Sequence, residues 1–443
     1  MTPPAPPAPA GDLDDRLGGL LGQLSWRGML QHRTPGLEAR LASGRPISGY
    51  NGFDPSGPSL HVGHLIPVFG LLHFQRHGGR PVAVLGGGTG MIGDPSGRSA
   101  ERNLLDRDAI AANAAGIRSQ LERFLDFSPG SGGAVMVNNL DWLGETSMLD
   151  FLRDVGKHFT IPYMLAKDSV QTRLSGGLSY TEFSYMLLQA ADYLHLYREL
   201  GVELQMGGAD QWGNITAGLE LIRRVEGAGE GVELAHGLSY PLLTDEGGAK
   251  FGKTAEGTSV WLDPGRTSRY AFYQYWLNVP DANVGRYLRL FTLLSPAEIE
   301  ALEAEQAAAP ERRVAQRALA LDVTARVHGA EQAGAMRDAS EAVFSGRVYS
   351  LPPAERDAVA GQLDAGRPIS RSAFAGGLTA LQLAVSSGAV ASQGEARRII
   401  GQGGFYVNDE RVADPGARIE PPSGDRLFVR LGKKRYLVIP VEG

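Results

Sequence analysis

The sequence predicts an α/β protein with a Rossmann-like parallel-sheet catalytic domain, followed by an α-helical domain and a small α+β domain. Residues 50–53 have the pattern of a strand, 60–77 that of a helix, and 81–85 form a continuous apolar run typical of a buried parallel strand. Residues 267–344 have helical periodicity throughout, and residues 405–412 and 427–438 have the pattern of two hairpins. We therefore expect a βαβ unit first and smaller units after it.

Composition limits the class of protein. The chain has 443 residues, too many for one ordinary domain, with no cysteine and a net charge of -6. Its first residues, MTPPAPPAPAGD, have neither the basic nor the apolar region of a signal peptide, so residues 1–12 are expected to be a disordered tail. No apolar run is long enough to span a bilayer. We expect a cytoplasmic protein that needs no disulfide.

Breaks in the pattern divide the rest of the chain. We expect the catalytic domain over residues 13–265 and the helical domain over 266–350. The stretch from residue 351 to Gly377 has weak periodicity and several glycines, which predicts a linker over 351–375. The last domain, over 376–443, combines helices with basic hairpins and is a candidate RNA-backbone binder.

The stretch YNGFDPSGPSLHVGH at residues 50–64 predicts an anion site. Gly52 and Gly57 let the backbone approach a ligand, and Ser59 is placed to cap a helix entered at Leu60, in which Pro67 should cause a kink. His61 and His64 are three residues apart, so both fall on one face of the first turn. The free N–H groups and dipole of that turn favour a phosphate.

A rival motif follows the second strand. Gly88, Gly90 and Gly93 match GxGxxG, which would suggest a dinucleotide-dependent oxidoreductase. That fingerprint needs a helix starting within the glycines and an acid about 20 residues later. Residues 94–97, DPSG, are turn residues instead, which disfavours the oxidoreductase.

Further candidates lie on a helix and on loops. Tyr185, Gln189 and Asp192 are spaced four and three apart, so they share one face of the helix expected over 181–200. Residues 207–211, GGADQ, follow another strand at the edge where ligands bind in open sheets. Without cysteine or HExxH, a zinc site is not expected. The loop lysines Lys250 and Lys253 could clamp phosphates, and a basic surface includes Arg397, Arg398, Lys433 and Lys434.

HVGH resembles the HIGH signature, and KFGKT the KMSKS signature, of class I aminoacyl-tRNA synthetases. Within that class, YNGFDPS, GDPSGR, TEFSYMLLQAAD and GGADQWGN are similar to segments of the bacterial tyrosyl-tRNA synthetases, and the likeness covers nearly the whole chain after the tail. The last segment is similar to the RNA-binding domain named after ribosomal small-subunit protein four. Gly252 and Thr254 depart from the signature, where the class has serines.

The resemblance implies that the chain activates L-tyrosine with ATP, accompanied by Mg²⁺, and transfers it to tRNA(Tyr). It also implies a homodimer, whose interface we place at residues 148–165. No metal bound by the protein alone is expected. The implied catalytic residues are His61, His64, Lys250, Lys253 and Ser56. The implied tyrosine site has Tyr50 and Asp192 at the phenol, Asp94, Tyr185 and Gln189 at the ammonium group, and Gln211 at the carboxylate, with Asp54 nearby. The implied ATP site comprises Gly52, Gly208, Asp210, Leu242, Leu243 and Lys253.

Two alternatives remain. A tryptophanyl-tRNA synthetase would share the fold and both signatures, but Tyr50, Asp192 and the basic last domain argue against it. A non-catalytic RNA-binding protein on the same scaffold would have no need of both histidines and both lysines.

Overall fold

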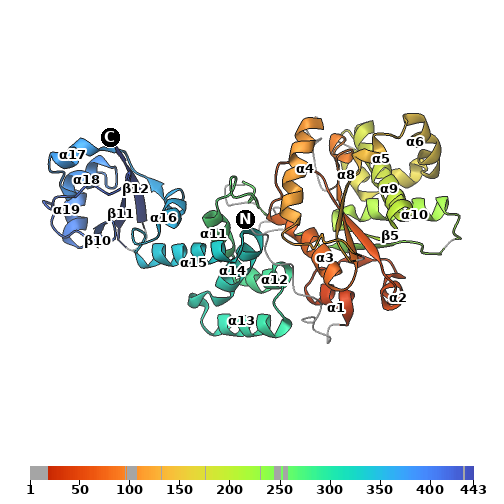
Figure 1. Cartoon of the computed structure of the whole chain (residues 1–443), viewed down its shortest axis with the longest axis horizontal. Coiled ribbons are helices and arrows are strands. Elements are labelled where there is room, and N and C mark those ends of the chain that lie inside the picture. The colour runs from red at the N-terminus through yellow and green to blue at the C-terminus, as the bar shows by residue number, and fades with distance from the viewer. Residues whose placement is uncertain are drawn as a thin grey trace. The chain divides into compact units, whose positions relative to one another are not determined.

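A computed structural model describes residues 18–94, 96, 107–130, 132–174, 176–229, 231–243, 251–252, 258–432 and 435–443 (Figure 1). These residues form two compact units. The first unit contains residues 18–266 together with Val279–Leu319, and the second contains Thr267–Asn278 together with Ala320–Gly443.

The first unit contains a six-stranded sheet in the order β1-β6-β5-β2-β3-β4. Five strands are parallel: β2 (Ser48–Phe53), β3 (Arg80–Leu85), β4 (Val135–Asn138), β5 (Val202–Gly208) and β6 (His236–Tyr240). The two-residue strand β1 (His32–Arg33) pairs antiparallel with β6 at one edge. The predicted α/β class is confirmed, and β2 in the middle of the sheet places its carboxyl end centrally.

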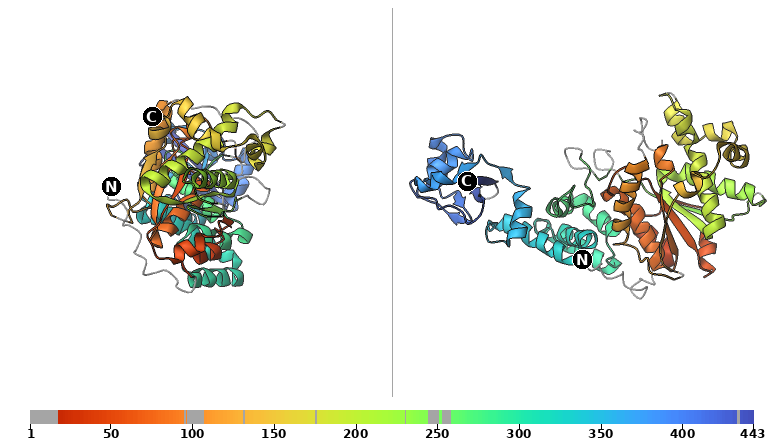
Figure 2. Two further views of the ribbon diagram at one scale, coloured as in Figure 1. Left: turned by 90° about the vertical axis from the view of Figure 1, so that its right-hand side faces the viewer. Right: turned by 45° about the horizontal axis from the view of Figure 1, so that its top comes forward.

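Helices cover both faces of this sheet (Figures 1 and 2). Helix α3 (Leu65–Arg76) lies on one face, and α9 (Tyr180–Leu200) and α10 (Trp212–Val225) pack together on the other. The unit also contains α1 (Gly19–Trp26), α2 (Leu37–Ala42), α4 (Arg107–Leu121), α5 (Leu140–Leu143), α6 (Met148–Asp154), α7 (Ile161–Leu165), α8 (Asp168–Leu174), α12 (Asp281–Phe291) and α13 (Pro296–Ala308). Short 3-10 turns are η3 (Val62–His64), η4 (Thr89–Met91), η5 (Gly156–His158), η6 (Ala209–Gln211) and η7 (Pro310–Arg312).

The helix expected from Leu60 begins differently. The turn η3 comes first, and α3 starts at Leu65, so Pro67 lies in the first turn of α3. The first N–H groups of a helix have no partner within it, so proline costs no hydrogen bond there. The reason for expecting a kink at Pro67 therefore does not apply. Ser59 does not cap the helix, because its Oγ donates to the carbonyl of Leu60.

The second unit combines helices with a small sheet. Its helices include α11 (Arg269–Leu277), α15 (Ala330–Ser345), α16 (Pro353–Ala360), α18 (Ala380–Ser386) and α19 (Gln393–Gly401), and α14 (Val314–His328) runs into it from the first unit. The sheet has the order β10-β9-β11-β12-β7. Both predicted hairpins form in it, from β9 (Phe405–Val407) with β10 (Glu410–Arg411), and from β11 (Arg426–Leu431) with β12 (Arg435–Glu442).

The linker expected over residues 351–375 is corrected by the structure. It contains α16, two short strands and α17 (Arg371–Ala375). Strands β7 (Asp364–Ala365) and β8 (Ile369–Ser370) both pair with β12, and Ile369 and Phe374 belong to the core of the small sheet. Two-residue strands that pair with a segment some 70 residues later leave almost no local periodicity, which is why the sequence pattern resembled a linker. The division into catalytic, helical and RNA-binding domains stays a prediction.

Candidate functional site

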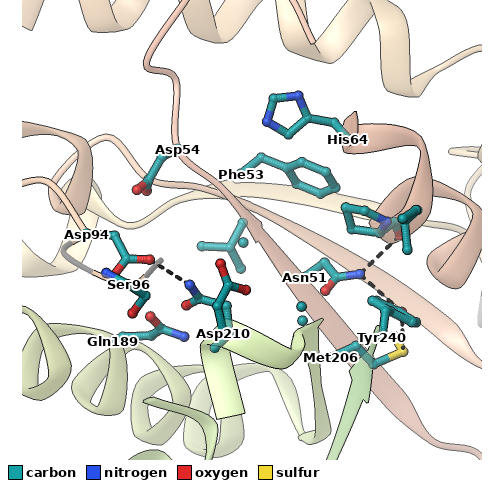
Figure 3. Close-up of a pocket in the computed structure, with 18 of the residues that line it drawn as sticks. Asn51, Phe53, Asp54, His64, Asp94, Ser96, Gln189, Met206, Asp210 and Tyr240 are labelled. Carbon is teal, nitrogen blue, oxygen red and sulfur yellow. Dashed lines mark hydrogen bonds between the residues drawn. The ribbon is translucent and has the colours of Figure 1, made fainter. Parts of the chain in front are cut away.

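A cavity of about 570 Å³ opens at the carboxyl ends of the parallel strands in the first unit (Figure 3). Its walls come from the ends of β2, β5 and β6, from η3 and from α9. Fifteen residues that the sequence suggested line it together: Tyr50, Gly52, Asp54, Ser56, His61, His64, Asp94, Tyr185, Gln189, Asp192, Gly208, Asp210, Gln211, Leu242 and Leu243. Lys250 and Lys253 lie outside the described residues.

The two histidines are in contact at the start of η3. His61 is its N-cap residue, and the ring centroids of His61 and His64 are 3.9 Å apart. His61 Nδ1 accepts from the N–H of Gly63 at 3.0 Å, and His64 Nδ1 accepts from the N–H of His61 at 3.1 Å. A neutral imidazole that accepts at Nδ1 carries its proton on Nε2. Both rings are therefore held as Nε2–H donors, which suits an anion.

The described part of the KFGKT segment packs against the HVGH segment. Gly252 has φ 103°, a conformation that favours glycine over the serine of the class pattern. A Cβ at Gly252 would lie 3.2 Å from the nitrogen of Gly63, so the two turns are closely packed. The Phe251 ring stacks on Phe291 at 5.4 Å and meets Tyr287 edge-on at 5.2 Å. The departure at Gly252 thus has a backbone reason.

The acidic end of the cavity is built around Asp192, which is 3% exposed. Its Oδ2 accepts from Asn139 Nδ2 at 2.8 Å and its Oδ1 from Trp142 Nε1 at 2.7 Å. Burial raises the pKa of Asp192 to about 7, while these hydrogen bonds act in the opposite direction. Burial, with the charge of Asp192, also holds the pKa of Tyr50 well above its usual value. Within the described part of the chain, the buried hydroxyl of Tyr50 has no hydrogen-bond partner.

Asn139, Trp142 and Thr89 are site residues that the sequence reasoning did not single out. Asn139 directly follows β4, at the same sheet edge as the other site residues. A polar residue at the carboxyl end of a parallel strand is a signal that would have identified Asn139. Trp142 has no such signal, because it reaches Asp192 from the helix α5.

The residues expected around an ammonium group separate into two hydrogen-bonded sets. Asp94 accepts from Gln211 Nε2 at 2.6 Å and from the N–H of Ser96 at 2.9 Å. Tyr185 instead donates its hydroxyl to Asp54 at 3.2 Å. Both carboxylates line the same cavity, so two anionic groups are available for a cationic substrate group.

Gln189 and Gln211 are held together by a residue of α10. Asn214 Nδ2 donates to the side-chain oxygens of Gln189 at 3.0 Å and Gln211 at 3.2 Å. On the opposite wall, Asn51 donates to Tyr240 and to the carbonyl of Pro67 (Figure 3). Hydrogen bonds from Asn51 and Asn214 therefore hold the side chains on both of these walls.

The glycines after β3 make room for site side chains. A Cβ at Gly86 would lie 2.1 Å from Asp54 Oδ1, and one at Gly87 would lie 2.1 Å from Asn138 Oδ1. These contacts explain Gly86 and Gly87, which precede the GxGxxG motif. Within the motif, over residues 88–93, the helical element that starts is the three-residue turn η4 and not a longer helix. The dinucleotide interpretation is therefore not supported.

Some basic residues of the last segment are exposed, and others make contacts within the unit. Arg397 and Arg398 are exposed on α19. The Arg430 guanidinium lies 3.5 Å from the centroid of Tyr406, and Arg435 donates to the carbonyl of Ala389, so both make contacts within the unit. Lys433 and Lys434 lie outside the described residues.

Two features are absent from the described residues. No helix there has the length and apolar character needed to cross a membrane. No group of three or more His, Cys, Asp or Glu side chains is arranged to hold a metal ion in that part of the chain.

Comparison with known proteins identifies the family of the chain. Residues 42–345 match the family model described as tRNA synthetases class I (W and Y). The chain is 49% identical over 428 residues to the tyrosine--tRNA ligase of Roseiflexus castenholzii, with 95% of this chain and 99% of that protein covered. It is 47% identical over 430 residues to the tyrosine--tRNA ligase of Geobacillus stearothermophilus, with the same coverage.

A solved structure is also similar. The C-terminally truncated mitochondrial tyrosyl-tRNA synthetase of Coccidioides posadasii aligns with a TM-score of 0.64 and 31% identity, covering 73% of this chain and 92% of that one. Fold, signatures and family model define the chain as a class I aminoacyl-tRNA synthetase. Within that class, it belongs to the tyrosine--tRNA ligase family.

Proposed function

We propose that the chain joins L-tyrosine to tRNA(Tyr) in two steps. The tyrosine carboxylate attacks the α-phosphorus of ATP, and the bond to the β-phosphate breaks to release pyrophosphate. A hydroxyl of the terminal tRNA ribose then attacks the carbonyl of the adenylate, and AMP leaves. The observation that carries the tyrosine assignment is the buried Asp192 carboxylate beside the hydroxyl of Tyr50, which has no hydrogen-bond partner among the described residues.

The first step needs positioning and charge stabilisation more than proton transfer, because the attacking carboxylate is already ionised. We assign the stabilisation of the phosphates to His61, His64 and Ser56, with the loop residues Lys250 and Lys253. The Nε2–H donors of the two histidines support this assignment. Mg²⁺ is assigned to the ATP phosphates, whose oxygens are the hard ligands that this ion prefers.

The nucleoside part of ATP is assigned to the ends of β5 and β6. Asp210 and the backbone of Gly208 would hold the ribose, and Leu242 and Leu243 would cover the adenine, with Gly52 beneath the phosphates. A Cβ at Gly208 would lie 2.6 Å from Asp210 Oδ1, so any larger residue there would displace that carboxylate.

Tyrosine is assigned to the cavity with its phenol at Tyr50 and Asp192. Its ammonium group would lie near Asp94, Tyr185 and Gln189, with Asp54 behind Tyr185, and its carboxylate near Gln211. A buried carboxylate that accepts from the phenol is left without that donor by phenylalanine, which penalises the wrong substrate.

A homodimer is the proposed assembly, in the cytoplasm. Four large apolar side chains are exposed on α6 and α7: Met148 by 76%, Leu149 by 77%, Leu152 by 41% and Ile161 by 59%. Large exposed apolar patches mark interaction surfaces in soluble proteins, and these four side chains are candidates for one. They lie within the stretch 148–165 that the sequence suggested.

The last segment is the proposed tRNA-binding part, through Arg397, Arg398, Lys433 and Lys434. A chain that ends at Ser350 should still form tyrosyl-adenylate but charge tRNA poorly. Phosphate contacts also make the tRNA affinity of the whole protein fall more steeply with salt than that of the shortened one. A folded shortened protein that makes no adenylate, or that charges tRNA with an unchanged salt dependence, would contradict this division.

The decisive experiment is amino-acid-dependent pyrophosphate exchange, run with each of the standard amino acids. We expect exchange with tyrosine alone. Exchange with tryptophan would support the first alternative, and no exchange with any amino acid would support the non-catalytic RNA-binding protein.

A further inference from the structure

A continuous series of hydrogen bonds joins two carboxylates that line the cavity. Thr89 Oγ1 donates to Asp54 Oδ1 at 3.0 Å and accepts from Asn139 Nδ2 at 3.0 Å. The same Asn139 nitrogen donates to Asp192 Oδ2 at 2.8 Å. Thr89 is 3% exposed and Asn139 is 1% exposed. Asp54, which follows β2, and Asp192, on α9, are thus joined by two buried neutral side chains.

The direction of each hydrogen bond in this chain is determined. The N–H of Gly88 donates to Asn139 Oδ1 at 2.7 Å, which fixes the orientation of the amide. The two protons of the Asn139 amide then go to Thr89 and Asp192. A hydroxyl has one proton, so Thr89, having accepted from Asn139, gives its proton to Asp54. Both carboxylates therefore receive a donor.

We propose that Thr89 and Asn139 form a relay that couples Asp54 to Asp192, so that Thr89 is a positioning residue for the rejection of phenylalanine. Thr89 makes no hydrogen bond to Asp192, so it would act only through Asn139. The inference rests on the proposed function, which places the phenol of the substrate at Asp192 and its ammonium group near Asp94, Tyr185 and Gln189, with Asp54 behind Tyr185.

The relay has a physical consequence for the Asp192 carboxylate. Without the Thr89 hydroxyl, one proton of the buried Asn139 amide loses its acceptor, and Asp54 Oδ1 loses the hydrogen bond from Thr89. Leaving buried polar groups unpaired is costly, so the Asn139 amide would turn to recover a partner. It would then no longer hold Asp192 Oδ2 in one direction, and the acceptor offered to the phenol would be less well placed.

Thr89→Val tests the relay, because valine has nearly the shape of threonine without its hydroxyl. We expect the ratio of kcat/KM for tyrosine to that for phenylalanine, measured by pyrophosphate exchange, to fall about tenfold, the size expected for one misplaced hydrogen bond to a charged group. Thr89→Ser restores the hydroxyl and should keep the ratio within about twofold of the wild-type value. If Thr89→Val does not fold, Thr89→Ala carries the same expectation.

A double-mutant cycle separates the relay from a local effect at Thr89. In an Asp192→Asn background, Thr89→Val should leave the tyrosine-to-phenylalanine ratio unchanged, because the group on which the relay acts has been altered. Equal loss for both amino acids in Thr89→Val, or the same fall in ratio with and without Asp192→Asn, would overturn the relay. A wild-type protein that shows no tyrosine-dependent exchange would instead overturn the proposed function, before any variant is compared.

Discussion

The pH dependence of amino-acid selection should report the ionisation of Asp192. Burial raises the pKa of Asp192 to about 7, so this carboxyl titrates in the range where the enzyme can be assayed. For a single group with that pKa, about nine-tenths is ionised near pH 8 and about one-tenth near pH 6. Asn139 and Trp142 each donate to one oxygen of Asp192. Only the ionised carboxylate can accept a further hydrogen bond from the phenol while it keeps these two. We therefore expect the ratio of kcat/KM for tyrosine to that for phenylalanine to fall about tenfold from pH 8 to pH 6.

The ratio is the right quantity to measure, because ionisations common to both amino acids and to ATP cancel in it. The assay is pyrophosphate exchange with each amino acid in steps across that range. Asp192→Asn is the matched control: its ratio should already be low near pH 8 and should not change with pH. A wild-type ratio that is flat between pH 6 and pH 8, or an equally steep fall in Asp192→Asn, would refute the reasoning. Tyr50 and Asp54 are the ionisable groups that interact electrostatically with Asp192. Tyr50 stays neutral over this pH range, because its pKa is raised well above its usual value.

The raised pKa also has a consequence for stability. Between about pH 4 and pH 7, the folded protein holds a proton on Asp192 that the unfolded chain has released. The stabilisation from this group is therefore present at low pH and is lost as the pH rises through about 7. The free energy of unfolding of the wild type, measured by denaturant titration, should fall over this range relative to that of Asp192→Asn. A constant difference between the two proteins would contradict the raised pKa.

Three further changes have defined outcomes. Gly86→Ala would place a Cβ 2.1 Å from Asp54 Oδ1, so the KM for tyrosine should rise at least tenfold, whereas an unchanged KM would show that Asp54 has no part in binding. Lys250→Ala and Lys253→Ala should each slow adenylate formation in pre-steady-state kinetics with little change in tyrosine affinity, and a wild-type rate would make the loop an ordinary solvated turn. Arg27→Met removes a buried guanidinium that donates to three backbone carbonyls at the end of α12, so the free energy of unfolding should fall by about 3 kcal/mol, and a loss below the error of a denaturant titration would contradict that role.

Local pattern was sufficient for the elements that are defined by neighbours in the chain. The buried strand over residues 81–85 and the amphipathic helix that contains Tyr185, Gln189 and Asp192 were predicted because their periodicity is local. Both C-terminal hairpins were predicted because their turn residues are local too. At residues 408 and 409, Asn and Asp adopt the positive φ angles that such a turn requires.

The linker over 351–375 shows where local pattern fails. Strands β7 and β8 exist only because β12 offers them an edge, and that partner is far away in the sequence. A two-residue strand carries too few side chains for its own pattern to indicate it. The start of α3 was missed for a different, local reason: the turn η3 precedes the helix, and within it the N–H of His61 donates to the side chain of His64.

For the site, the sequence by itself determined which chemical groups are present and which signatures carry them. Glycine turns, two histidines and an acid on a helix face each have a local reason that can be seen in the residues. Only the tertiary structure decided which groups meet: Asp192 with Asn139 and Trp142, and Tyr185 with Asp54 across 131 positions. It also decided the pKa of Asp192, because burial depends on side chains from several elements closing over one carboxylate. These hydrogen bonds and the burial of Asp192 join segments that are far apart in the sequence, so no local pattern indicates them.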